Sequence, residues 1–209
     1  MHTKQIRKLI VEAIAIEEKT HNLRNALDTV ASMRGCRLTE QQRKEAIQFI
    51  REYVEHAPAL FDHIAEAARK AGIYQQISNI LDAAEQYFLQ SFDLMPDSLG
   101  LLGLMDDAYV AHKIIQDLSD RYQQQSGFTL VPSDMTNTNL VMRTLIGEPQ
   151  ASMLDNAIAV TLGQPLLQQA LQAAINNGAF MNLQGPDPIW GNASIDEIVN
   201  TRMGVMGIF

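Results

Sequence analysis

The stretch that decides the fold is residues 90–110, which read QSFDLMPDSLGLLGLMDDAYV. It places four aspartates in the most apolar part of the chain. A helix is predicted from Leu99 through Ile115 to about Tyr122, and it is apolar on nearly every side, so we expect it to be buried. Asp106 and Asp107 stand side by side within it. Because burial strips a carboxylate of its hydration, we expect donors, a cation or a proton to compensate them.

A turn is predicted just before this helix, where Asp93 and Asp97 flank Pro96. Proline disfavours helical geometry at the residue that precedes it, which is Met95. Asp97 or Ser98 is then suited to cap the N-terminus of the next helix. The sequence therefore predicts a central helical hairpin around the stretch from Asp93 to Asp107.

These residues resemble the core of the YkvA-like domain, a bacterial family of unknown function, over roughly residues 73–122. The family pattern is Asp-Leu-Ile-Pro-Asp, a short apolar run, a glycine, an apolar pair and Asp-Asp. The matching residues are Asp93, Pro96, Asp97, Gly103, Asp106 and Asp107. The chain departs from the pattern at Leu99-Gly100, where members often carry a second proline. The resemblance implies a small helical domain and no established reaction.

Two interpretations of the aspartates stay open. Asp93, Asp97, Asp106 and Asp107 could form a divalent-cation site, since hard cations bind carboxylate oxygens. Alternatively, the aspartates stabilise the turn by capping it and by accepting hydrogen bonds from nearby N–H groups. Neighbouring helical residues point about 100° apart, so at most one of the Asp106-Asp107 pair faces a given point. The spacing also fits no EF-hand loop, and the structural interpretation is favoured.

Motifs for catalysis are missing from the sequence. It contains no Gly-x-Ser-x-Gly elbow, no phosphate-binding loop and no pair of histidines at helical four-residue spacing. His56, His63 and His112 are expected at the surface or partly buried. The sequence leaves any cofactor unknown, and it does not decide whether the protein is an enzyme.

Charge is distributed unevenly along the chain, whose formal net charge is −8. Residues 1–72 hold twelve basic and ten acidic residues, whereas residues 73–209 hold four basic and fourteen acidic ones. This balance argues against nucleic acid as a partner. The single cysteine, Cys36, suits a reducing compartment, so a cytoplasmic location is expected. No uncharged apolar run reaches the length of a membrane span, and an integral span is not expected.

Apolar residues recur at helical spacing through most of the chain, and no convincing strand is present. Residues 6–30 follow a heptad-like pattern with a polar break at Thr20, which predicts one long helix ended by Gly35. Thr39 begins the next helix with a capping box, and Ala57-Pro58 is predicted to break it. More helices are predicted over 60–71, from 73 to the aspartate turn, and over 136–146, 150–162 and 165–177.

The fold class is therefore an all-α multi-helix bundle. Residues 1–125 are predicted to form a bundle that contains the YkvA-like segment. Residues 126–209 are predicted to be a helical extension, packed on the first part or on a second subunit. Only two charged residues lie between Thr144 and Pro186, and such low-charge helices usually hide their surfaces.

Three functional hypotheses follow. The first is a non-enzymatic protein-interaction or scaffold module that binds a protein partner or forms a homo-oligomer. The second is a divalent-cation-binding protein or metal-dependent enzyme that uses the aspartates. The third is a peripheral membrane role, motivated by the apolar segment and the apolar C-terminal sequence from Met203 to Phe209.

Overall fold

The computed structural model describes residues 2–33, 35–90, 94–131, 134–163 and 172. Within these ranges the chain forms seven α-helices and one 3-10 helix and contains no strand, which confirms the all-α prediction. The elements are α1 (Thr3–Thr20), α2 (Asn22–Met33), α3 (Glu40–Lys70), α4 (Tyr74–Phe88), η1 (Asp97–Leu102), α5 (Met105–Ser126), α6 (Thr136–Ile146) and α7 (Gln150–Leu162). The helix predicted over 165–177 lies outside the described residues, as does the apolar C-terminal sequence.

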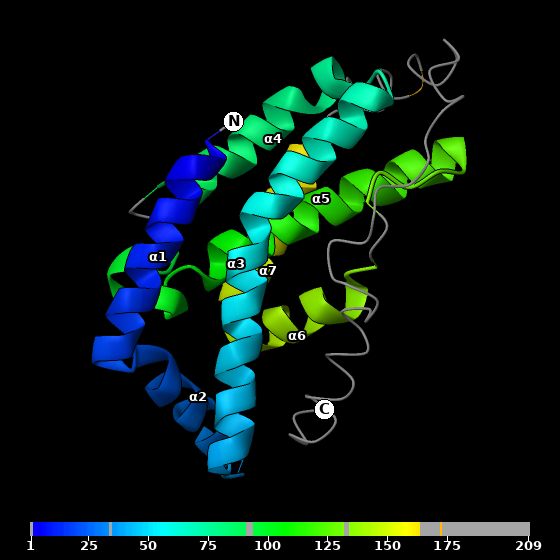
Figure 1. Cartoon of the computed structure of the whole chain (residues 1–209). Coiled ribbons are helices and arrows are strands. Elements are labelled where there is room, and N and C mark those ends of the chain that lie inside the picture. Colours follow the sequence, from blue (N-terminus) through cyan, green and yellow to red (C-terminus); the bar gives the residue numbers. More distant parts are fainter. Residues whose placement is uncertain (1, 34, 91–93, 132–133, 164–171, 173–209) are drawn as a thin grey trace.

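The single long helix predicted over residues 6–30 is wrong, because the chain turns between α1 and α2 (Figure 1). His21 ends α1 in the left-handed region, with φ of 55°. The buried Glu17 carboxylate then accepts the Leu23 N–H at 3.2 and 3.0 Å. Glu17 therefore compensates a backbone donor at the start of α2, which would otherwise lack a partner.

The predicted break at Ala57-Pro58 is also wrong. The capping box at Thr39 begins α3 as expected, but the helix continues through Pro58 to Lys70. A proline within a helix removes one backbone hydrogen bond and crowds the preceding turn. Ala57, Leu60 and Phe61 beside it are all fully buried. The apolar burial of this part of α3 outweighs the local preference for a break.

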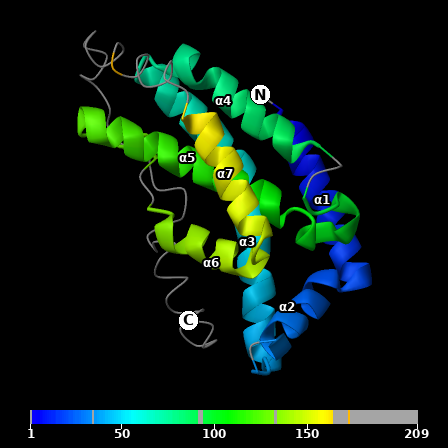
Figure 2. The ribbon, with the colours of Figure 1, turned by 180° about the vertical axis from the view of Figure 1, so that it is seen from behind.

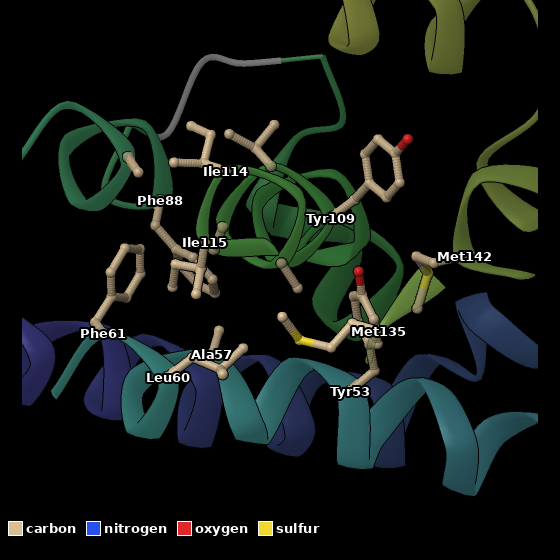
Figure 3. Close-up of a cluster of buried hydrophobic side chains, with 14 of the residues drawn as sticks. Tyr53, Ala57, Leu60, Phe61, Phe88, Tyr109, Ile114, Ile115, Met135 and Met142 are labelled. Atoms are coloured by element: carbon tan, nitrogen blue, oxygen red, sulfur yellow. The ribbon is translucent and has the colours of Figure 1, made fainter. Parts of the chain in front are cut away.

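α5 is the central helix, in contact with α3, α4, α6 and α7. Figure 3 shows the core between α3 and α5, where Tyr53, Leu60 and Phe61 face Tyr109 and Ile115. α3 runs along the face seen in Figure 1, whereas the view from behind in Figure 2 brings α7 in front of α5. α5 is thus covered on opposite sides by α3 and α7.

α6 and α7 match the helices predicted over 136–146 and 150–162, and both pack on α5. The division of the chain at residue 125 stays a prediction. Among the described residues, no helix is both long and apolar enough to cross a lipid bilayer.

Candidate functional site

The 3-10 helix η1, which precedes α5, packs against both α1 and α2. Here the sequence prediction needs a correction, because residues 97–102 form the 3-10 helix η1 and α5 begins only at Met105. Gly100 interrupts helical geometry with φ of 73° and ψ of −135°. A Cβ atom on it would lie 2.9 Å from the Ala13 carbonyl oxygen of α1. The Asn22 side chain donates to the Leu99 carbonyl at 3.3 Å and ties α2 to the turn.

Glycine is also required at position 103, because the backbone of Pro96 and Asp97 approaches its Cα closely. Its φ of −67° is open to any residue, so conformation does not select glycine here. A Cβ atom would instead collide with the Pro96 carbonyl oxygen and lie 2.9 Å from the Asp97 Cα. Gly103 thus lets the turn fold back on itself immediately before α5.

Asp106 joins this turn to α4. It is fully buried, and its Oδ2 accepts the Met95 N–H at 3.3 Å and the Tyr87 hydroxyl at 3.4 Å. It also occupies the first turn of α5, where unpaired N–H groups and the helix dipole favour negative charge. This geometry matches the hydrogen bonding that the structural interpretation of the aspartates requires.

The remaining aspartates are placed differently. Asp107 is 1 % exposed and shares the first turn of α5. Asp97 begins η1, whose N-cap is Pro96, so neither Asp97 nor Ser98 caps the long helix as predicted. Within the described ranges, no three His, Cys, Asp or Glu side chains are grouped so as to hold a metal. Asp93 lies outside those ranges, so the four-aspartate cation site stays a prediction.

A buried histidine pair lies between α3 and α5. His56 Nδ1 is 3.2 Å from His112 Nε2, and His112 Nδ1 is 2.8 Å from the Ala108 carbonyl oxygen. Because a carbonyl only accepts, His112 carries its proton on Nδ1 and accepts from His56 Nδ1. Tyr53 stacks on the His112 ring with 3.9 Å between centroids. The expectation of surface or partly buried histidines is wrong for His112, which is fully buried, and for His56, which is also buried.

Burial also fixes the charge state of this pair. Loss of hydration lowers the pKa of His112 to about 4, although the hydrogen bond to Ala108 opposes the shift. Burial, with the neighbouring His112 and His63, lowers the pKa of His56 to about 2. Both rings are therefore neutral near pH 7 and act as hydrogen-bonding groups of the core.

A polar network continues from this pair into α6. The Tyr53 hydroxyl donates to Asn139 Oδ1 at 2.6 Å, Asn139 donates to Gln116 at 2.7 Å, and Gln116 donates to Thr136 at 2.7 Å. The first of these bonds joins residues 86 positions apart. No local motif signals such a contact, so the sequence did not reveal it.

A second cluster joins α5, α6 and α7. The Tyr109 hydroxyl donates to Asp155 Oδ1 at 2.6 Å, and Arg143 Nε donates to Asp155 Oδ2 at 2.8 Å. Arg143 also pairs with Glu148 at 2.7 Å. Glu148 and Asp155, the two charged residues between Thr144 and Pro186, are thus both engaged by one arginine.

The outer face of α7 is uncharged and mostly apolar, and Asn156 is its exposed polar residue. Met153 is 55 % exposed and Val160 is 77 % exposed, and Ala157 between them is also exposed. The spacings of four and three residues place these side chains on one stripe, the α7 stripe. The only charged residue of α7 is Asp155, which is held by Tyr109 and Arg143. A surface helix normally carries charged or polar residues on its outer face.

A partly open apolar pocket of about 100 Å³ borders this stripe, between α4, α5 and α7. Its lining includes three alanines, Ala83, Ala84 and Ala157, together with Tyr87 and Thr161. Ala157 belongs both to the pocket and to the α7 stripe, so the two form one continuous apolar surface.

Residues 83–112 match the family described as "Protein of unknown function (DUF1232)". The resemblance to the bacterial YkvA-like domain is consistent with this match. The matched segment runs from Ala83 in α4, through η1, to His112 in α5, and so contains Gly100, Gly103 and Asp106. Searches of curated proteins and of solved structures found no match.

Proposed function

We propose that this protein is a non-enzymatic helical interaction module that self-associates through the α7 stripe. The observation that carries the proposal is an exposed helix face formed by Met153, Ala157 and Val160 with no charged residue among them. Contiguous exposed apolar surface of this kind is typical of protein-interaction sites. We also propose a cytoplasmic location, which the free, exposed Cys36 supports.

The buried polar groups support a scaffold role. His112, Asn139 and Gln116 hydrogen-bond across helix interfaces, and Asp106 holds the turn before α5. Groups engaged in this way give the core a fixed helix arrangement. The apolar face of α7 then rests on a rigid frame, which lowers the entropic cost of binding.

Analytical ultracentrifugation at tens of micromolar tests the proposal. The parent protein is expected to form a dimer, and Val160→Glu should weaken association at least tenfold, about 1.4 kcal/mol, because a charge enters an apolar contact. Glutamate is a good helix former, so the melting temperature of the diluted monomer should stay near that of the parent.

Val11→Glu is the matched control, because Val11 is also an exposed valine on a helix, with 66 % of its surface accessible. It lies on α1, away from the α7 stripe, and should leave the dimer intact. A parent protein that stays monomeric throughout this range would refute self-association, and equal weakening by both variants would refute the role of α7.

A further inference from the structure

We draw no further inference here: the strongest candidate, the partly open apolar pocket between α4, α5 and α7, carries none because nothing among the residues that the structure describes shows what fills or covers it.

Discussion

Asp106 is a buried carboxylate, and the groups around it stabilise its negative charge. It accepts one bond from the turn backbone at Met95 and one from the Tyr87 hydroxyl of α4. It also lies at the N-terminal end of α5, where the helix dipole favours a negative charge. One side chain therefore fixes the relative positions of α4, the turn and α5.

Asp106→Asn should lower the stability of the metal-free protein by about 1–3 kcal/mol. Asparagine keeps the shape but presents a neutral amide, which weakens the bonds from Met95 and Tyr87. Thermal melting in the presence of a chelator measures the effect. Asp82→Asn on the same hairpin is the control, because Asp82 is exposed and its loss should change little.

The cation-site interpretation gives the opposite sign for this variant. Carboxylates gathered around an empty site repel one another, so an asparagine would relieve the repulsion. Asp106→Asn and Asp107→Asn would then melt at or above the parent in chelator and lose any response to divalent ions. That result would refute the structural role assigned to Asp106.

At the scale of the helices, the sequence predicted those boundaries that depend on nearby residues. The capping box at Thr39 and the extents of α6 and α7 are of this kind. It missed boundaries that depend on distant contacts. At the start of α2, Asn22 donates to the Leu99 carbonyl, 77 positions away, and Gly100, just before α5, packs against the backbone of α1.

The same distinction holds for the candidate site. The aspartate turn was recognised because its residues lie close together in sequence. The pairing of His56 with His112 joins residues 56 positions apart, and the pocket needs three helices to form. Neither leaves a periodic signal in the chain, because both depend on how α3, α4 and α7 pack around α5.

Gly100→Ala tests the packing of η1 on α1. Alanine would place its Cβ 2.9 Å from the Ala13 carbonyl and 3.1 Å from the Glu17 nitrogen. Gly147→Ala is the matched control, because Gly147 also has positive φ, at 79°, but no atom within 4 Å of the added Cβ. Both variants strain the backbone, and Gly100→Ala should cost about 1–3 kcal/mol more because it is also crowded. Chemical denaturation measures both, and equal losses would contradict the close approach.

At the scale of the whole molecule, a layer of polar contacts crosses the apolar core. The histidine pair, Tyr53, Asn139 and Gln116 connect α3, α5 and α6. Such a layer restricts how the helices can pack, since a shifted helix would leave buried donors unsatisfied. It also makes the stability of the whole bundle sensitive to pH, because two of its members titrate.

The direction of that sensitivity follows from the histidine pKa values. His112 has a folded pKa of about 4, below the ordinary histidine pKa of 6.5. Between these values the unfolded chain binds the extra proton, so stability is full above pH 6.5 and falls as the pH decreases toward 4. From pH 7 to pH 5 this histidine alone should remove about 2 kcal/mol. His56, with a pKa lowered to about 2, acts in the same direction and down to lower pH.

Urea denaturation of the parent and of His112→Gln at pH 7 and pH 5 isolates this contribution. Burial raises the pKa of Glu85 and of Asp120, so these carboxyls favour the folded state as pH falls and partly offset the histidines in both proteins. Glutamine does not titrate, so the variant should be less stable than the parent at pH 7 but lose less on acidification. The two stability curves should therefore converge toward pH 5. Parallel curves would mean that His112 is already accessible to protons in the folded protein, in conflict with its burial beneath Tyr53.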